Sequence, residues 1–308
     1  MPVMNAADRC WSLQETMVWF SCTLTPVIVP GHDDVEPLPA GRMTSGIIRR
    51  GDRVWRPMGS WSPAVHEYLR HLESAGFDGA PRVLGVDGDR EVLSFMAGEV
   101  AADPAWQPGH GHRLPAYTRT VEALRASARL LRRLHDAASG FKPARTEYRF
   151  HPHPPAPGEV ICHGDLGPWN TVYNDGLPVA FIDWDSAGPA SPLTDLAAAA
   201  WVFVPLAPAQ QLVEAGFHQP GEMAGRLREF VAAYGLAEPA AILPALVRSQ
   251  LADADRVWHL APPSAALARG DDPPAPHRLA AGVADSLEHR ARQLRWLDSV
   301  MPDLQDAL

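Results

Sequence analysis

The sequence is poor in cysteine and has no excess of positive charge, and both absences narrow the possible functions. It has three cysteines, Cys10, Cys22 and Cys162, which are too few and too scattered for a disulfide framework or a zinc site. The formal net charge is −9, whereas a nucleic-acid-binding surface is basic. We therefore expect a protein of the reducing cytoplasm that has no nucleic-acid partner.

A hydrophobic run long enough to cross a membrane is also missing. The most apolar segment near the start, Met17–Pro30, spans 14 residues, whereas a spanning helix needs about 20. Arg9 is the only basic residue upstream of it, and no cleavage site of small residues follows it. We expect no membrane partner, and we interpret residues 1–38 as a strand-forming extension or a poorly ordered tail.

What the sequence does have is a chain of 308 residues, which is long enough for two lobes with a core. The 24 glycines and 31 prolines predict many sharp turns. Strand-like patterns come first and helical patterns follow, which indicates an α+β fold. The predicted parts are an N-terminal extension (1–38), a small lobe with an antiparallel sheet (39–98), a connector (99–117) and a larger, mainly helical lobe (118–308).

The small lobe is predicted to be an antiparallel sheet with one helix. A strand over Gly46–Arg50, a turn at Gly51–Asp52 and a strand over Arg53–Arg56 have the pattern of a β-hairpin. Residues 62–76 have apolar side chains at helical spacing. Two further strands are expected around a turn at residues 87–89.

The larger lobe is predicted to contain a β-hairpin among helices. Residues 118–139 and 191–203 have helical patterns. Between them, Asn174–Gly176 is a strong turn signal with apolar residues on both sides. We therefore expect Thr171–Tyr173 and Pro178–Ile182 to pair as antiparallel strands.

Three oxygen-bearing side chains are expected at the open end of that hairpin. Folding the chain at the turn places Asn170, just before the first strand, opposite Asp183, just after the second. Asp165 lies on the loop that leads into the hairpin. Oxygen ligands suit Mg²⁺, which fills its other positions with water and substrate phosphate, so Asn170 and Asp183 are the predicted metal ligands. The structural alternatives are that Asp165 bonds its own turn and that Asn170 caps the loop.

The motif HGDLGPWN (His163–Asn170) resembles the catalytic loop H-R-D-x-x-x-x-N of protein kinases. Glycine in place of arginine, and IDWD (Ile182–Asp185) after the hairpin, more closely resemble the aminoglycoside phosphotransferase and choline kinase-like family. The segments RLLRRLHDA before the motif and SPLTDLA after it resemble the same family. The likeness extends over Pro39–Val204 and implies a protein kinase-like two-lobe fold.

This resemblance implies an ATP-dependent O-phosphotransferase that uses Mg²⁺ and acts on a hydroxyl group of a small molecule. Asp165 would orient this hydroxyl towards the terminal phosphate, which contributes about 10²–10⁴-fold. Asn170 and Asp183 would hold Mg²⁺ across the phosphates, and Asp185 would reach a second ion. The acceptor is expected to be aminoglycoside-like or another amino or sugar metabolite, and the acidic chain favours a cationic one.

By the same resemblance, the small lobe contributes the nucleotide site. A glycine-flanked loop stands where the family covers the phosphates, which assigns Thr44, Ser45 and Gly46 to ATP binding. Arg56 stands where the family has a lysine, and its guanidinium can clamp phosphate through two hydrogen bonds.

Two further features of the nucleotide side follow from the family pattern. The helix glutamate that pairs with the lysine in kinases falls on Val65, and Glu67 points away from the apolar stripe. The ion pair is therefore expected to be absent or rebuilt. The segment LSFMAGE resembles the hinge that binds adenine through its backbone, and Ser94 and Met96 are the candidates there.

Several polar residues near the motif are predicted to be structural. His163 is expected to brace the loop through hydrogen bonds and not to transfer protons. Asp195 is favoured in the first turn of its helix by the helix dipole, and the resemblance implies that it also ties down the catalytic loop. His135 is expected to be structural, and Cys162 is expected to be a small buried hydrophobe.

Two alternative functions remain open. The departures at Arg56 and Val65 favour a nucleotide-binding protein of the same fold without turnover, which acts in sensing or immunity. A metal-dependent hydrolase built on His163, Asp165 and Asp183 would need more ligands than this region supplies.

The acceptor pocket has no sequence motif. Acidic residues of the helical lobe are candidates for contact with a cationic acceptor, or else are solvated surface: Asp253, Asp255, Asp271 and Asp272. No oligomeric state is predicted.

Overall fold

The computed structural model describes most of the chain, and side chains within residues 255–286 are excluded from the description. The described residues are 35–38, 44–101, 114–217, 222–260 and 276–308. The chain divides into two units, Met1–Asp33 and Asp34–Leu308, and all described residues belong to the second. The apolar segment Met17–Pro30 therefore lies outside the described residues.

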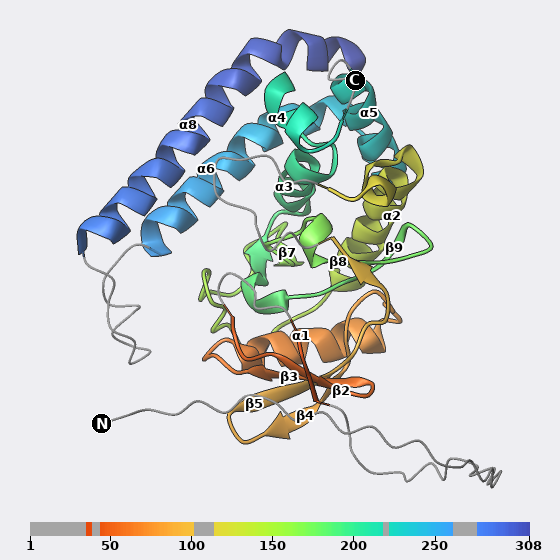
Figure 1. Ribbon diagram of the computed structural model, residues 1–308, viewed down its shortest axis with the longest axis vertical. Coiled ribbons are helices and arrows are strands. Elements are labelled where there is room, and N and C mark those ends of the chain that lie inside the picture. The colour runs from red at the N-terminus through yellow and green to blue at the C-terminus, as the bar shows by residue number, and fades with distance from the viewer. Residues whose placement is uncertain (1–34, 39–43, 102–113, 218–221, 261–275) are drawn as a thin grey trace, which may run out of the picture. The chain divides into compact units, whose positions relative to one another are not determined.

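A five-stranded antiparallel sheet forms the N-terminal part of the second unit (Figure 1). Its strands lie in the order β1-β2-β3-β5-β4, with these bounds: β1 (Val35–Pro37), β2 (Ile48–Arg50), β3 (Arg53–Pro57), β4 (Val83–Asp87) and β5 (Arg90–Ser94). The predicted hairpin at Gly51–Asp52 is confirmed, because Arg50 pairs with Arg53 across it. Strand β1 lies within residues 1–38, for which the sequence predicts an extension, and it pairs with β2.

Helix α1 (Ser62–Ser74) contacts the sheet at β4 and the helical region at α2 (Val121–Ala138). Its predicted apolar stripe is confirmed, since four side chains are buried: Val65, Tyr68, Leu69 and Leu72. Full burial of such a side chain contributes about 1.5–3 kcal/mol. The Tyr68 hydroxyl also donates to the carbonyl oxygen of Ile161 at 2.6 Å, which fixes α1 against the strand that precedes HGDLGPWN.

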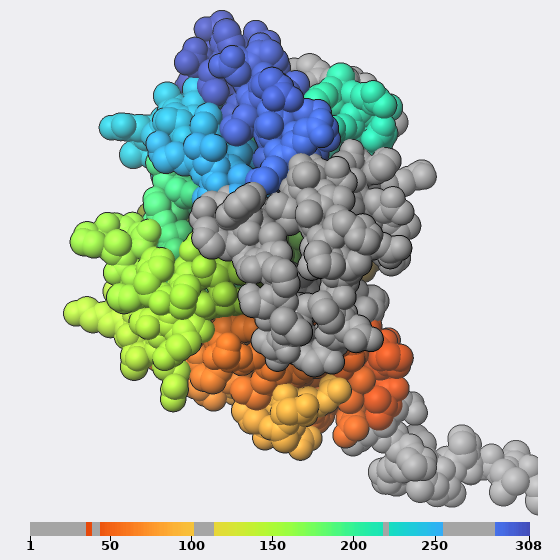
Figure 2. All heavy atoms as spheres, turned by 90° about the vertical axis from the view of Figure 1, so that its left-hand side faces the viewer, coloured from red at the N-terminus to blue at the C-terminus, as the bar shows by residue number. Residues whose placement is uncertain are grey.

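The rest of the second unit is mainly helical. After α2 come α3 (Pro192–Phe203), α4 (Ala209–Glu214), α5 (Met223–Tyr234), α6 (Ile242–Leu260) and α8 (Pro276–Ala307), with 3₁₀ helices at Ala116–Arg119, Pro168–Asn170, Trp184–Ser186 and Pro239–Ala241. Helix α2 packs on α5, and α3 packs on α6. Helices α6 and α8 lie side by side (Figures 1 and 2). The predicted α+β class, with a small antiparallel sheet and a larger helical region, is confirmed.

Two small antiparallel sheets lie within the helical region. They are β6-β8-β9, from Glu99–Val100, Thr171–Asn174 and Leu177–Phe181, and β7-β10, from Val160–Cys162 and Gly188–Ala190. The predicted hairpin is β8–β9, and its two turn residues have positive φ, 50° at Asp175 and 75° at Gly176. Two consecutive positive φ angles are typical of the type I′ turn, whose twist matches the flanking strands.

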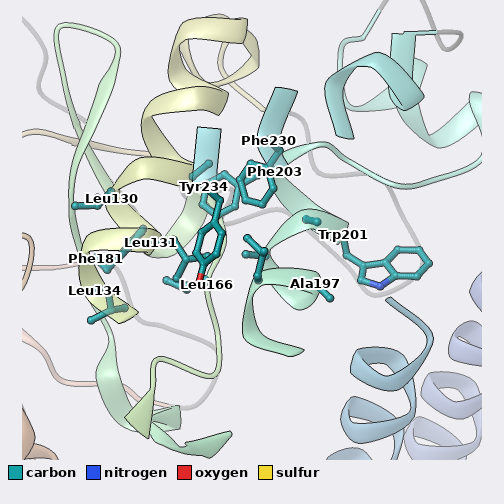
Figure 3. Close-up of a cluster of buried hydrophobic side chains, with 14 of the residues drawn as sticks. Leu130, Leu131, Leu134, Leu166, Phe181, Ala197, Trp201, Phe203, Phe230 and Tyr234 are labelled. Carbon is teal, nitrogen blue, oxygen red and sulfur yellow. The ribbon is translucent and has the colours of Figure 1, made fainter. Parts of the chain in front are cut away.

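A buried apolar cluster holds this hairpin against the helices (Figure 3). Leu131 and Leu134 of α2 lie near Phe181 of β9, while Phe203 of α3 stacks on Phe230 of α5 with ring centroids 6.2 Å apart. Truncating an aromatic side chain in such a core costs about 3–5 kcal/mol. The cluster therefore fixes the position of the hairpin's open end.

Among the described residues, no single helix combines the length and hydropathy of a membrane span. The pair formed by Met223–Tyr234 and Pro239–Ala254, which is bent by 110°, meets the length and composition criteria together.

Candidate active site

The β8–β9 hairpin brings the predicted metal ligands close together. Thr171 pairs with Phe181, and the N–H of Ile182 donates to the carbonyl oxygen of Asn170 at 2.9 Å. Asn170 therefore lies opposite Ile182, and Asp183 is the next residue along the chain. The expected juxtaposition is thus present with a shift of one residue, because Ile182 and not Asp183 is the direct neighbour of Asn170.

The side chain of Asn170 holds Asp165. Its Nδ2 donates to the main-chain oxygen of Asp165 at 2.8 Å and to the carboxylate Oδ2 at 3.2 Å. Because the amide nitrogen is directed at Asp165, the amide Oδ1 is directed elsewhere. The same side chain can thus orient the acid and present an oxygen to a cation.

His163 braces the loop through both ring nitrogens. Its Nε2–H donates to the carbonyl oxygen of Ile182 at 3.0 Å, and its Nδ1 accepts from the N–H of Asp165 at 3.3 Å. The ring is completely buried and lies 4.5 Å from the ring of Trp184. Burial lowers the pKa of His163 below its usual value, so the imidazole is neutral. Since both nitrogens have backbone partners, His163 is not available as a metal ligand for a hydrolase.

A buried polar cluster lies behind the loop. Asp195 accepts from the N–H of Gly164 at 3.4 Å and bonds His135 Nε2 at 3.1 Å, while His135 Nδ1 bonds the hydroxyl of Tyr234 at 2.8 Å. Cys162 Sγ lies 3.9 Å from His135 Nε2, and burial, aided by the charge of Asp195, raises the pKa of the Cys162 thiol. Asp195, His135 and Cys162 are close enough to share a metal ion. Because their ligand atoms already bond one another and the loop, we interpret the cluster as structural.

Two left-handed backbone positions shape the loop. Gly164 has φ 77°, and a Cβ there would lie 2.3 Å from the carbonyl oxygen of Ser186, so only glycine fits after His163. Asp183 has φ 64° and is not glycine. Such a conformation costs an ordinary residue about 1–2 kcal/mol, and it persists where surrounding contacts hold it, often at functional sites.

Arg56 is the centre of a buried ion-pair network. Its Nη2 lies 2.6 Å from Asp183 Oδ1 and 3.1 Å from Asp185 Oδ2, and its Nη1 lies 3.5 Å from Glu91 Oε1. Burial alone would lower the pKa of Arg56, but the three carboxylates outweigh it and raise the pKa. The sequence holds a single lysine, Lys142, so the sheet has no lysine that could replace Arg56.

The acid that pairs with Arg56 comes from β5 and not from α1. Glu91 is the direct neighbour of Arg56 in the β3–β5 register, and its Oε2 accepts from His66 Nε2 on α1 at 2.6 Å. Glu67 points elsewhere, because its carboxylate accepts from the backbone N–H groups of residues 144–145. The ion pair that the sequence leaves open is thus present in rebuilt form.

Asp185 is surrounded by donors. It accepts from the Thr44 hydroxyl at 3.1 Å and from Arg56, and Arg149 Nη1 lies 3.6 Å away. The guanidinium of Arg149 also lies 4.2 Å from the ring centre of Trp61. Two arginines neutralise Asp185, so this arrangement does not support the expectation that it reaches a second metal ion.

The other residues predicted for phosphate contact lie next to Thr44. Ser45 and Gly46 are exposed, and Gly46 has φ 72°. The carbonyl oxygen of Gly46 accepts from Arg90 Nη1 at 2.6 Å, which anchors this end of the loop to the sheet.

The two hinge candidates differ in their surroundings. Ser94 is engaged within the sheet, because its N–H donates to the carbonyl oxygen of Arg82 at 2.9 Å and its hydroxyl accepts from the N–H of Arg82 at 2.8 Å. Met96 lies beyond the end of β5 and is half-buried. Backbone contact with adenine is therefore easier at Met96 than at the N–H of Ser94.

The acidic candidates for a cationic acceptor receive little support. Asp253 forms an ion pair with Arg290 of α8, so its charge is already matched. Asp271 and Asp272 lie outside the described residues, as does the side chain of Asp255.

Sequence reasoning missed Glu91, His66 and Arg149. For Glu91 a signal existed, because pairing the two predicted hairpins of the small lobe edge to edge would set Glu91 beside Arg56 in one register. His66 and Arg149 had no such signal, since one lies on a helix and the other on an irregular segment before the motif.

Comparisons with known proteins point to the same phosphotransferase family as the motifs. Residues 145–234 match the sequence model of the Phosphotransferase enzyme family, and this segment contains HGDLGPWN and IDWD. The trifolitoxin immunity protein of Rhizobium leguminosarum bv. trifolii is 40% identical over 177 residues, which cover 56% of this chain and 62% of that protein. The chain thus matches less than two thirds of the length of this relative.

Solved structures share the fold. The gentamicin complex of APH(2")-IIa has a TM-score of 0.50 and 14% identity, over 83% of this chain and 91% of that one. The ADP-bound aminoglycoside phosphotransferase APH(2'')-Ib has a TM-score of 0.50 and 12% identity, over 84% and 94%. These structures confirm the kinase-like two-lobe fold, and the family model confirms the resemblance to the phosphotransferase family over residues 145–234.

Proposed function

We propose that this protein is an ATP-dependent O-phosphotransferase that acts on a hydroxyl group of a small molecule in the cytoplasm and uses Mg²⁺. The observation that carries the proposal is the placement of Asp165, Asn170 and Asp183 at the open end of one hairpin. All three lie in the segment that matches the phosphotransferase family. The acceptor is an amino or sugar metabolite, as supported by the gentamicin-bound structure of the same fold.

Asp165 accepts the hydrogen bond of the acceptor hydroxyl and aims its oxygen at the terminal phosphorus of ATP. Its carboxylate is held by Asn170, and its N–H by His163, so the acid is oriented before the acceptor arrives. Phosphoryl transfer needs positioning and charge neutralisation more than covalent help from the protein. The acceptor oxygen forms a bond to the γ-phosphorus while the bond from that phosphorus to the β,γ-bridging oxygen breaks, so that ADP leaves with the bridging oxygen and its electron pair. The hydroxyl proton passes to the Asp165 carboxylate.

The donor set at the hairpin fits Mg²⁺. Among the residues that the structure describes, Arg56 is the sole ion-pair partner of Asp183 and uses Oδ1, which leaves Oδ2 for a cation. Asn170 would supply its amide Oδ1, since its nitrogen is bound to Asp165. Two hard oxygen ligands are the number that Mg²⁺ usually takes from a protein when it also binds phosphate. When bound, the ion neutralises charge on the phosphate oxygens.

The five-stranded sheet and the loop before β2 supply the residues for the phosphates of the nucleotide. Arg56 presents its guanidinium towards the hairpin, and Thr44 is tied to the same place through Asp185. A guanidinium is suited to bidentate binding of phosphate oxygens. We assign Thr44, Ser45, Gly46 and Arg56 to the phosphates, with Met96 at the adenine.

The test is turnover of ATP with a panel of hydroxylated amines and sugars, with formation of the phosphorylated acceptor followed by mass spectrometry. We expect Mg²⁺-dependent phosphate transfer to at least one amino sugar or amino alcohol. Absence of Mg·ATP binding by calorimetry would contradict the proposal.

A second candidate is immunity to a toxin, which the 40% identity to the trifolitoxin immunity protein supports. The chain would then protect a cell either by phosphorylating a target or by binding alone. An Asp165→Asn variant separates the two possibilities. If both protection and ATP binding survive this substitution, protection does not depend on phosphoryl transfer.

A further inference from the structure

We propose that Glu91 and His66 are positioning residues that hold Arg56 in place for the nucleotide, a role that no comparison assigns to them. The inference rests on the proposed function, because it assumes that Arg56 binds the phosphates of ATP. It explains how the chain works without a lysine on β3 and without a glutamate of α1 paired to Arg56.

The three residues form a buried chain of contacts. Arg56 is 7% exposed, Glu91 3% and His66 4%. Each oxygen of the Glu91 carboxylate has its own partner, Oε1 at 3.5 Å from Arg56 Nη1 and Oε2 at 2.6 Å from His66 Nε2. A buried charge is costly unless it is paired and hydrogen-bonded, so Glu91 depends on both partners.

The two ends of the Arg56 guanidinium face different acids. Nη1 is directed at Glu91, and Nη2 is directed at Asp183 and Asp185. A guanidinium offers five N–H groups in a rigid planar fork, whereas a lysine offers one nitrogen. The bridge between β5 and the hairpin therefore requires arginine at position 56.

The charge of Glu91 attracts Arg56 in the direction opposite to Asp183 and Asp185. Without its charge, Arg56 would be drawn entirely towards Asp183 and Asp185, because attraction between close charges is strong where water is excluded. The Nη1 end would then also pair with an acid of the hairpin, in addition to the contact of 2.6 Å that Nη2 already makes with Asp183. With Glu91 in place, the Nη1 end of the guanidinium stays at the sheet.

His66 connects this arrangement to helix α1. Its Nε2–H donates to the Oε2 of Glu91, which fixes the rotamer of the acid. Since β3 and β5 are neighbours in the sheet, Glu91 already has the right strand position, and His66 contributes its orientation. The helix thus reaches Arg56 through an imidazole and a strand acid.

The experiment measures the affinity for Mg·ATP by calorimetry in the full chain and its variants. Glu91→Gln should weaken binding about 10- to 100-fold, the equivalent of one hydrogen bond to a charged group. His66→Leu should also lower the affinity for Mg·ATP. His66→Gln should keep the affinity close to that of the wild type, because the glutamine amide can donate from a similar position. Glu73→Gln is the matched control, an exposed acid on the same helix, and should leave the affinity unchanged.

A double-mutant cycle with Arg56→Gln separates positioning from general destabilisation. If Glu91 acts through Arg56, adding Glu91→Gln to Arg56→Gln causes no further loss of affinity. Additive losses, or a Glu91→Gln affinity within twofold of the wild type, would overturn the inference. Should Glu91→Gln fail to fold, the contrast between His66→Leu and His66→Gln decides the question in the same way.

The outcomes also distinguish this inference from the proposed function. A wild-type chain that does not bind Mg·ATP contradicts both. A wild-type chain that binds Mg·ATP but is insensitive to Glu91→Gln and His66→Leu contradicts the positioning role alone.

Discussion

The two halves of the proposed site are held by different kinds of interaction. In the hairpin half, residues 163–185, main-chain groups take part in most contacts, such as those of Ile182 with Asn170 and His163. In the sheet half, Arg56 and its partners are held by side-chain ion pairs between separate elements.

This difference predicts different sensitivities. The hairpin half should respond most to changes that alter the course of the backbone, apart from Asp165, which we assign to the acceptor hydroxyl. The sheet half should respond to changes of charge even where the shape of the side chain is kept. The predictions below test that contrast, from the largest expected effect to the smallest.

Replacement of Asp165, the acid that we assign to the acceptor hydroxyl, should have the largest effect. Asp165→Asn keeps the shape of the side chain and removes the proton acceptor, so we expect kcat to fall about 10²–10⁴-fold, with the affinity for Mg·ATP unchanged. Asp175→Asn, at the turn of the same hairpin, is the control, because asparagine tolerates a positive φ. Equal rates for wild type and Asp165→Asn in a coupled ATPase assay would exclude the role of Asp165.

A change of backbone in the hairpin half should come next. Gly164→Ala adds a Cβ at positive φ and against the oxygen of Ser186, which together cost about 2–4 kcal/mol of unfolding free energy. Gly158 also has positive φ, 86°, but a Cβ there meets no atom within 4 Å. Gly158→Ala should therefore cost only about 1–2 kcal/mol. Urea denaturation measures the difference, and equal values would show that the contact with Ser186 is unimportant.

A change of charge at the junction of the two halves should affect metal dependence. Asp183→Asn tolerates the left-handed backbone but removes the charge, so we expect the gain in nucleotide affinity from Mg²⁺ to fall at least about tenfold. Asp185→Asn should keep this gain, because Asp185 is bound by Thr44 and two arginines. Calorimetric titrations of ATP with and without Mg²⁺ compare the two variants, and a reversed order would exchange their assignments.

The smallest predicted effect is a dependence of stability on pH. Because burial lowers the pKa of His163 in the folded state, the unfolded state binds a proton first as the pH falls below about 6.5. The unfolding free energy should therefore fall with decreasing pH, by at most about 1.4 kcal/mol per pH unit from this group.

The His163→Gln variant should show a shallower fall in stability between pH 7 and pH 5 than the wild type. His289 also has a lowered pKa, caused mainly by burial, and it lies on α8, away from the site. His289→Gln therefore measures how much a histidine with a lowered pKa outside the site contributes to the same slope. An identical slope for wild type and His163→Gln would show that folding does not lower the pKa of His163.

The hairpin half could be predicted from the sequence because its contacts are local. A turn at Asp175–Gly176 with apolar flanks predicts that the two strands pair, and a one-residue register shift between Val172 and Tyr173 then sets Asn170 against Ile182. The identities of Asp165 and Asp183 then follow from their places before and after the strands. Periodicity likewise gave α1 and α2, whose buried stripes are regular.

The sheet half could be predicted only in part, because its contacts depend on how separate elements pack. Arg56 was assigned because the resembling family has a lysine on that strand. Its partner was sought on α1, where Val65 faces the core and Glu67 faces another segment. The acid came instead from Glu91, across the sheet. Pairing between β3 and β5 is a tertiary contact, since α1 and β4 separate the two strands in the chain.

The guanidinium of Arg56 determines which chemical reagents can detect ATP at the proposed nucleotide site. Acylating ATP probes modify a primary amine beside the phosphates, and an arginine is not such a target because it stays protonated. The sole lysine, Lys142, is exposed on the segment after α2. Labelling of this chain by an amine-directed ATP probe should thus be confined to Lys142 among side chains and should be insensitive to competing nucleotide, so screens of that kind would overlook the protein.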